Sequence, residues 1–202
     1  MQATNSIRRL QATCGFLKNF KKNFCNNTNN TNTIKEYDGI IYTNHSKFVS
    51  EITLNSPKSL NSLDNKMIKT LLKRVKKWVP NLEMTSETED PEYKKFEIPK
   101  IVFMTGAGEK AFCAGGDVKS LYLAKVNDGN DKFVKDFFRY EYLLDYSLSQ
   151  METIQIAFWN GFVMGGGVGL SQNAPIRIAT DNTVWAMPGN LFKFNWIYSE
   201  IK

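Results

Sequence analysis

Two glycine-rich segments have the composition of an anion-stabilising site. One spans residues 105–117 (TGAGEKAFCAGGD) and the other spans residues 161–167 (GFVMGGG). Each follows an apolar run that predicts a buried strand and precedes a run that predicts a helix. Glycine lets the backbone approach a ligand closely, and the first turn of a helix has N–H groups without intrahelical acceptors. One N–H group from each turn could meet at a single oxygen, as in an oxyanion hole for a thioester or an enolate.

A simpler alternative is that these glycines serve packing alone, by letting each helix lie close to its strand. Neither segment matches the phosphate-binding GxxxxGK[ST] loop, and GAGEKA does not match the dinucleotide-binding GxGxxG pattern. The glycines of one segment taken alone therefore do not distinguish a binding site from tight packing.

Residue types that serve nucleophilic catalysis are scarce in this chain. His45 is the only histidine, and the polar stretch YTNHSK around it predicts a solvated loop residue. A Ser-His-Asp or Cys-His system needs a histidine beside its nucleophile, so a base here must be a carboxylate or water. Of the three cysteines, Cys14 and Cys25 lie near the N-terminus and only Cys113 lies in the body. This set predicts no disulfide framework and no metal site, and it fits an intracellular protein.

Apolar runs at regular intervals predict the strands that must position these turns. Val49, Ile52 and Leu54 do not alternate strictly, which predicts a bulged or two-sided strand in FVSEITLN. The other predicted strands are GIIYT, KIVFMTG, TIQIAFWNG and IRIAT.

Helices are predicted between these strands. Apolar residues of 63–79 recur every three to four positions and predict an amphipathic helix, capped by Ser62 or Asp64 and stopped by Pro80. Further helices are predicted at VKSLYLAK, over residues 131–151 and after MGGGVGL, and an exposed acidic loop is predicted at residues 81–97. Strands that alternate with helices predict an α/β layered fold.

Charge is distributed unevenly along the chain. The formal net charge is +6, but residues 1–35 contain six basic residues and no acidic one, which leaves 20 basic and 20 acidic residues after them. The body is therefore neutral, which argues against nucleic acid as a partner. No apolar run approaches the length of a membrane span.

The basic leader has the pattern of a targeting segment. Residues 7–24 predict a basic amphipathic helix, and the tract NNTNNTNT that follows predicts a disordered linker. Residues 1–35 are therefore predicted to be a mitochondrial transit peptide with its linker, and the mature N-terminus is expected between Phe24 and Glu36. An ordinary disordered tail is the alternative.

The two glycine-rich segments together resemble the crotonase (enoyl-CoA hydratase/isomerase) superfamily. The stretches AFCAGGD and MGGGVGLS are similar to its 3-hydroxyisobutyryl-CoA hydrolase branch, and ITLNSPKSLNSL is similar to the N-terminal segment of that branch. The resemblance covers residues 37–188. It implies a spiral of repeated ββα units, here incomplete, with residues 36–188 as the N-terminal part of the domain and residues 189–202 as a tail outside the family.

Site residues follow from the resemblance position by position. It implies that the N–H groups of Gly116 and Gly166 form the oxyanion hole, and that Glu141 contacts the substrate. Lys58 and Leu60 match the loop that binds CoA. The first catalytic glutamate of the hydratases corresponds to Gly169, so the resemblance argues against hydration. It implies no metal and no cofactor apart from the CoA of the substrate.

Two catalytic positions depart from the family pattern. Where the hydrolases have a glutamate after AMP and an aspartate eight residues later, this chain has Gly189 and Ile197, and neither side chain can act as a base. Hydrolysis by this chain is therefore expected to be impaired or absent, and oligomer contacts are expected to be lost. The tail is interpreted as translated intron. If an intron began directly after the first G of the glutamate codon, reading through it would give GGT for Gly189 and AAT for Asn190. The sequence GTAAT at this junction is close to a common splice donor site.

Two functions remain open at this point. One is a mitochondrial matrix hydrolase of 3-hydroxyisobutyryl-CoA that acts in valine breakdown, and it is favoured by the presence of Gly116, Gly166 and Glu141. The other is a non-catalytic crotonase-like scaffold subunit, for example of a mitochondrial ribosome. It is favoured by the residues at positions 189 and 197.

Overall fold

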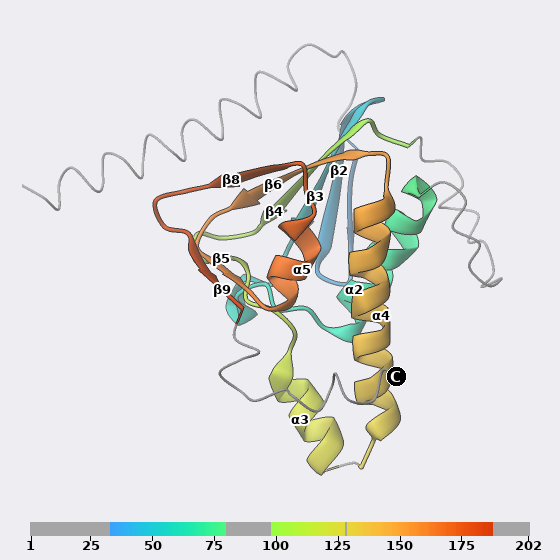
Figure 1. The fold of residues 1–202 in the computed structure, drawn as a ribbon, viewed down its shortest axis with the longest axis vertical. Coiled ribbons are helices and arrows are strands. Elements are labelled where there is room, and N and C mark those ends of the chain that lie inside the picture. The colour runs from blue at the N-terminus through green and yellow to red at the C-terminus, as the bar shows by residue number, and fades with distance from the viewer. Residues whose placement is uncertain (1–32, 80–97, 128, 188–202) are drawn as a thin grey trace, which may run out of the picture.

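A computed structural model describes residues 33–79, 98–127 and 129–187, which form two sheets and four helices (Figure 1). The larger sheet has the strand order β1-β2-β3-β4-β6-β8, and the smaller has the order β5-β7-β9. The strands of the larger sheet are β1 Thr33–Tyr37, β2 Ile40–Ser46, β3 Val49–Leu54, β4 Ile101–Gly106, β6 Ile154–Trp159 and β8 Ile176–Ala179. Those of the smaller sheet are β5 Ala111–Cys113, β7 Phe162–Met164 and β9 Val184–Ala186. The helices are α2 Asn65–Val75, α3 Val118–Val126, α4 Asp131–Gln150 and α5 Gly166–Gln172, with the short 3₁₀ turns η1 Pro57–Ser59 and η2 Lys76–Trp78.

The strands wind between the two sheets in a repeated order. β1, β2 and β3 pair antiparallel, whereas β3, β4, β6 and β8 pair parallel. In the successive pairs β4/β5, β6/β7 and β8/β9, the first strand joins the larger sheet and the second joins the smaller one. A helix follows each of the first two pairs, as a parallel sheet requires. This repetition confirms the predicted α/β, crotonase-like winding.

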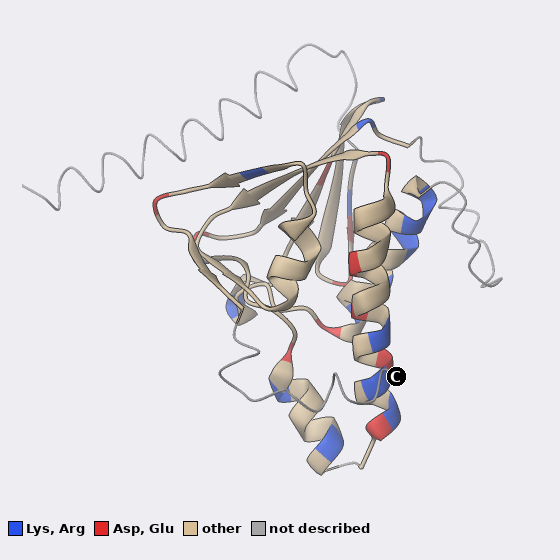
Figure 2. Cartoon of the chain, in the orientation of Figure 1, with Lys and Arg blue, Asp and Glu red and all other residues tan. Residues whose placement is uncertain are grey.

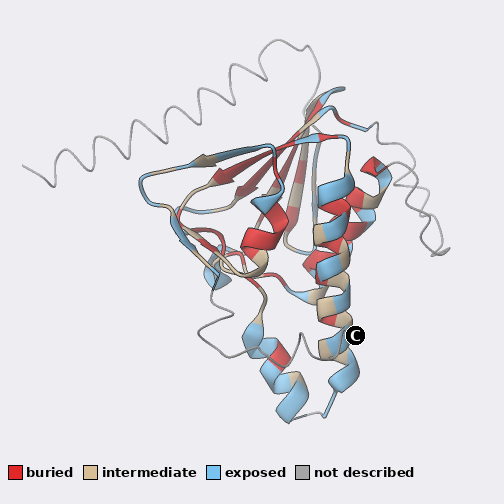
Figure 3. Cartoon of the chain, in the orientation of Figure 1, coloured by how far each residue is buried: buried red, intermediate tan, exposed pale blue. Residues whose placement is uncertain are grey.

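The central strands of the larger sheet are buried on both faces. Ile52 and Leu54 of β3 belong to the main core, which includes α2, α4 and α5. Val49, from the same strand, packs instead with Phe103 and Phe158 on the opposite face. Strand β3 is therefore two-sided, as its irregular apolar pattern predicted, and the pairing of β2 with β3 shifts register between positions 44 and 46. Figure 3 shows buried residues along the central strands and on the inward side of α4 and α5.

Helix α2 begins at the second of the two predicted caps. The Asp64 carboxylate accepts a hydrogen bond from the Met67 backbone N–H at 2.8 Å. A side-chain cap of this kind satisfies one of the N–H groups that the first helical turn leaves without an acceptor. The helix tightens into η2 at Lys76–Trp78, and the predicted stop at Pro80 lies outside the described residues.

The cap predicts a measurable loss of stability. Asp64→Ala should lower the free energy of unfolding by about 1 kcal/mol, because the Met67 N–H then loses its acceptor. Ser62→Ala is the matched control, since Ser62 is the rejected cap, and it should change that free energy by less than about 0.5 kcal/mol. Urea denaturation of both variants measures the difference, and equal losses would contradict the assignment.

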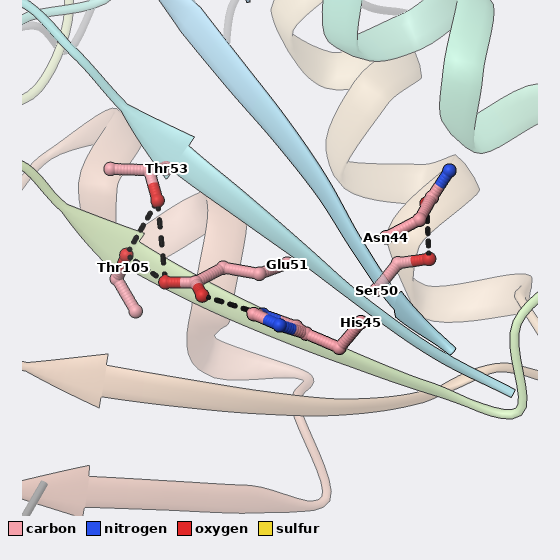
Figure 4. Close-up of polar contacts among 6 residues, drawn as sticks. All are labelled: Asn44, His45, Ser50, Glu51, Thr53 and Thr105. Atoms are coloured by element: carbon pink, nitrogen blue, oxygen red, sulfur yellow. Dashed lines mark hydrogen bonds and ion pairs between the residues drawn. The ribbon is translucent and has the colours of Figure 1, made fainter. Parts of the chain in front are cut away.

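The prediction that His45 is a solvated loop residue is wrong. His45 lies in strand β2, its side chain is only 11% exposed, and its Nε2 lies 3.0 Å from Oε2 of Glu51. Thr53 and Thr105 extend this polar cluster by donating hydroxyl hydrogen bonds to Oε1 of the same carboxylate (Figure 4). The polar residues around His45 resembled a turn, but the turn itself consists of residues 47 and 48, between β2 and β3.

The described residues also refine the edges of the predicted elements. β1 begins at Thr33 and pairs with β2, so the folded body includes the last residues assigned to the leader. The three short strands of the smaller sheet were not predicted, because three residues are too few to show a period of two. The predicted acidic loop at 81–97 lies outside the described residues.

Several apolar side chains are exposed. Many of them lie on the outer strands of both sheets, on α4 and on α3, which Figure 3 shows mostly exposed. They include Ile176, Val184, Trp185, Tyr122 and Val126. In the described parts of the chain, no helix is both long and apolar enough to cross a membrane.

Candidate functional site

The two glycine turns lie side by side. Gly115 has a φ of +99°, and a Cβ atom built on it would lie 2.9 Å from the Met164 carbonyl oxygen and 3.4 Å from the Gly166 backbone nitrogen. A side chain at Gly115 would therefore be strained by its own backbone and would push the turns apart. The fold thus brings together the two segments that the sequence singled out, which lie on β5–α3 and β7–α5.

Neither of the two amides expected to form an oxyanion hole donates to a backbone carbonyl in the turns of the described residues. The Gly116 residue is fixed by its neighbours, because Leu63 N–H donates to the Gly115 carbonyl and Asp117 N–H donates to the Leu63 carbonyl, each at 2.8 Å. Among the backbone bonds between described turns, the Gly116 N–H itself makes none. Gly166 is the first residue of α5, where a helical N–H has no acceptor within the helix.

Glu141 reaches Gly166 from helix α4. A Cβ atom at Gly166 would overlap Oε1 of Glu141, so the carboxyl group fills the space that a side chain there would take. Glu141 is only 6% exposed. Burial raises the pKa of its carboxyl group to about 7. The structure therefore places Glu141 against Gly166, and Gly115, the neighbour of Gly116, against the same turn.

A second carboxyl group, which the sequence analysis missed, stands one turn further along α4. Oδ2 of Asp145 lies where a Cβ atom at Gly169 would be, and Oδ1 is buried without a hydrogen-bond partner among the described residues. Burial, and to a smaller extent the nearby Glu141, raise the pKa of Asp145 to about 7. The i, i+4 spacing from Glu141 was the available signal, since such residues share a helix face.

These two pKa values predict how stability depends on pH. Both folded-state pKa values lie above the ordinary values of 4.5 and 3.8. At a pH between the ordinary and the folded-state pKa, the folded protein therefore holds protons that the unfolded chain has released. Their contribution is complete below about pH 4 and is lost as the pH rises through 7. We expect each group to lower the free energy of unfolding by about 2 kcal/mol between pH 5 and pH 8.

Urea denaturation across this pH range measures the effect. Glu141→Gln keeps the shape of the side chain and removes its titration, so this variant should show a flatter pH dependence. A wild-type stability that rises between pH 5 and pH 8 would contradict the prediction.

Lys58 and Leu60 lie on the rim of the glycine turns. Lys58 is exposed in η1, and Leu60 ends that turn with a φ of 56°. The Leu60 carbonyl accepts a hydrogen bond of 3.0 Å from the Ala114 N–H. Leu60 therefore contacts the backbone of the first glycine segment, whereas Lys58 extends from the same turn into solvent.

Asn61 connects this turn to the glycine segment and was also missed. Its side-chain nitrogen donates to the Ala107 and Ala111 carbonyls at 2.9 and 2.8 Å, and its side-chain oxygen accepts from the Ser56 N–H at 2.9 Å. Asn61 is completely buried and has a φ of 55°. Asparagine tolerates this left-handed conformation better than most residues, so Asn61 fixes the loop on which both Leu60 and the glycines depend.

Cys113 is close to the site but is not a nucleophile. Burial raises the pKa of its thiol to about 12, and the Glu141 and Asp145 carboxylates act in the same direction. A Cβ atom at Gly167 would lie 2.8 Å from the Cys113 Cβ atom, so this thiol packs beneath α5. Within the described ranges, no group of three or more His, Cys, Asp or Glu side chains is arranged to hold a metal.

A mostly apolar hollow opens beside Gly116. Its volume is about 260 Å³, and Asp117, Leu121, Phe133 and Phe137 line it together with residues at the start of α2. A Cβ atom at Gly116 would lie 2.9 Å from the ring of Phe137, which lines the hollow. The predicted positions Gly189 and Ile197 lie outside the described residues.

Residues 49–192 match the enoyl-CoA hydratase/isomerase family. The chain belongs to this family. Within it, the chain is 41% identical over 137 residues to a protein of Gallus gallus named 3-hydroxyisobutyryl-CoA hydrolase, mitochondrial, an alignment that covers 68% of this chain and 31% of the relative. It is 39% identical over 140 residues to the small ribosomal subunit protein mS47 of Neurospora crassa, which covers 68% of this chain and 24% of that protein.

A solved structure of a family member confirms the fold. The carnitinyl-CoA dehydratase of Mycobacterium thermoresistibile superimposes with a TM-score of 0.61 and 32% identity, and the match covers 75% of this chain and 39% of that one. The crotonase-like fold predicted from the sequence is therefore confirmed. The chain spans about a third or less of the length of the relatives it matches.

Proposed function

We propose that the site binds an acyl-CoA thioester and polarises its carbonyl group between the N–H groups of Gly116 and Gly166. The observation that carries this proposal is the adjacency of the two glycine turns, with no backbone acceptor for either amide among the described turns and Glu141 against Gly166. Two fixed donors stabilise the negative charge that develops on a carbonyl oxygen during attack. The reaction would need no metal and no cofactor apart from the CoA of the substrate.

The substrate we propose is 3-hydroxyisobutyryl-CoA, and the place is the mitochondrial matrix. Relatives at about 40% identity are named mitochondrial 3-hydroxyisobutyryl-CoA hydrolases, and the basic, acid-free leader agrees with import. The hollow beside Gly116 would hold the small acyl group. Lys58 and Leu60 would contact the CoA portion, and Glu141 would face the acyl group.

Turnover by this chain would be slow. In hydrolysis, water adds to the thioester carbon, the carbon–sulfur bond breaks and the thiolate of CoA takes up a proton. The proton released by the attacking water needs a base, and neither Gly189 nor Ile197 provides one. Loss of acid–base catalysis alone typically lowers a rate by about 10² to 10⁴-fold, so binding is expected to survive better than hydrolysis.

Two measurements on the full 202-residue chain test the proposal. Isothermal titration with 3-hydroxyisobutyryl-CoA should show binding, and release of free CoA should be at least about 100-fold slower than that of a complete hydrolase. Absence of binding would refute the proposed substrate. Turnover equal to that of a complete hydrolase would refute the impairment.

A second function, a scaffold subunit, is favoured by one relative, which is named as a small ribosomal subunit protein. Under this alternative the chain would co-sediment with the small subunit of the mitochondrial ribosome in sucrose gradients. A chain that binds the thioester and stays at the top of the gradient would exclude this role.

A further inference from the structure

The carboxyl groups of Glu141 and Asp145 occupy one surface of α4 and face α5. They stand four residues apart on α4, against Gly166 and Gly169, which stand three residues apart on α5. A Cβ atom at either glycine would overlap one of the two carboxyl groups. Both groups therefore enter the site through gaps that glycines leave in α5.

Among the described residues, no cation lowers the pKa of either group. Helix α5 (GGVGLSQ) has no titratable side chain, and Figure 2 shows it without a charged residue. On α4, each is the only charged neighbour of the other at a spacing of three or four residues. The titratable side chain from β5 is the neutral thiol of Cys113.

Cations on the neighbouring helices are directed elsewhere. On α2, Lys69 lies over the Tyr140 ring at 4.8 Å and Arg74 lies over the Tyr42 ring at 4.4 Å. On α3, Lys125 pairs with Asp131. The other cations of these two helices are exposed: Lys66, Lys73 and Lys119. The nearby carboxylates at helix N-termini act as caps: Asp64 caps α2 and Asp117 caps α3.

We propose that Asp145 is a positioning residue that shares one proton with Glu141, so that the pair carries a single negative charge and Glu141 can donate an O–H hydrogen bond to the ligand. Two buried carboxylates one helical turn apart repel each other, and retaining one proton removes this repulsion. A protonated Glu141 beside the Gly166 amide adds a third donor at this point of the site. The identity of the ligand rests on the proposed function, but proton sharing is a property of the free protein.

Carboxyl ¹³C NMR of the free 202-residue chain tests the sharing directly. In the wild type, the signals of Glu141 and Asp145 should each report the same two titration steps, the upper one near or above neutrality. In Asp145→Asn, the Glu141 signal should show one step, at least about one pH unit below that upper step. Asp136→Asn, on the exposed side of α4, is the matched control and should leave both signals unchanged.

The outcomes separate this inference from the proposed function. Wild-type signals that both titrate near pH 4, or a Glu141 step unmoved by Asp145→Asn, would overturn the sharing, and the wild-type result stands even if the variant does not fold. Affinity for 3-hydroxyisobutyryl-CoA should fall as the pH rises above the upper titration step of the pair. Asp145→Asn should lower the pH at which this fall begins by the same amount as it lowers the Glu141 titration step in NMR. A fall that begins at the same pH in both proteins would overturn the positioning role. Coupled signals without binding at any pH would refute the proposed substrate and leave the sharing intact.

Discussion

Gly166→Ala should weaken binding of an acyl-CoA thioester at least about 100-fold. The new methyl group would overlap Oε1 of Glu141 and would lie within 3.2 Å of the Leu63 side chain. Because Glu141 is buried on α4, its carboxyl group has little room to retreat. The substitution therefore displaces either the carboxyl group or the start of α5, and either movement separates the Gly166 N–H from that of Gly116.

Gly129→Ala provides a matched control for this prediction. Gly129 also has a positive φ, at +57°, but a Cβ atom there meets nothing within 4 Å. Alanine in this conformation should cost about 1 kcal/mol of stability and should leave affinity unchanged. Isothermal titration with 3-hydroxyisobutyryl-CoA, alongside urea denaturation, separates lost binding from lost folding. Equal affinity of the two variants would show that the Gly166 turn is not part of the binding site.

The sequence predicted the parts of the site that depend on backbone geometry. Glycines after buried strands indicate tight turns wherever they occur, and two such turns indicated a pair of convergent amides. The structure shows the turns in contact, because a Cβ atom built on Gly115 would lie only 3.4 Å from the Gly166 backbone nitrogen. The convergence itself could not be derived from one turn, since it depends on β5 and β7 pairing in the smaller sheet.

Residues that act through tertiary contacts were missed for a different reason. Asp145 sits in an ordinary amphipathic helix; its spacing from Glu141 places it on the same helix face, but the opposing Gly169 is known only from the structure. His45 has polar neighbours in sequence, but its partner Glu51 is on the adjacent strand. Periodicity describes which face of an element a side chain occupies, and it carries no information on which element covers that face.

Asn61 is the residue whose loss should unfold this region most. Asn61→Ala should lower the free energy of unfolding by about 4 kcal/mol, because it leaves two buried carbonyl groups and one N–H group without their partner. These belong to Ala107, Ala111 and Ser56. Alanine is also disfavoured at the observed φ of 55°.

Asn61→Gly separates these two causes. Glycine adopts the left-handed conformation without strain but makes none of the three hydrogen bonds, so its loss should be smaller than that of alanine by about 1 kcal/mol. Ser59→Ala is the control within the same turn. Its hydroxyl donates an exposed hydrogen bond of 3.1 Å to the Ser56 carbonyl, and its removal should cost less than about 0.5 kcal/mol.

Urea denaturation of the three variants measures the free energies, and amide hydrogen exchange locates the change. Because Asn61 joins the turn at Leu60 to the segment that ends at Gly116, Asn61→Ala should speed exchange in residues 106–116 before it affects α4. A loss below about 1 kcal/mol would contradict the prediction, because it would mean that water replaces the side chain in all three hydrogen bonds. An equal loss in the alanine and glycine variants would show that hydrogen bonding alone selects asparagine here.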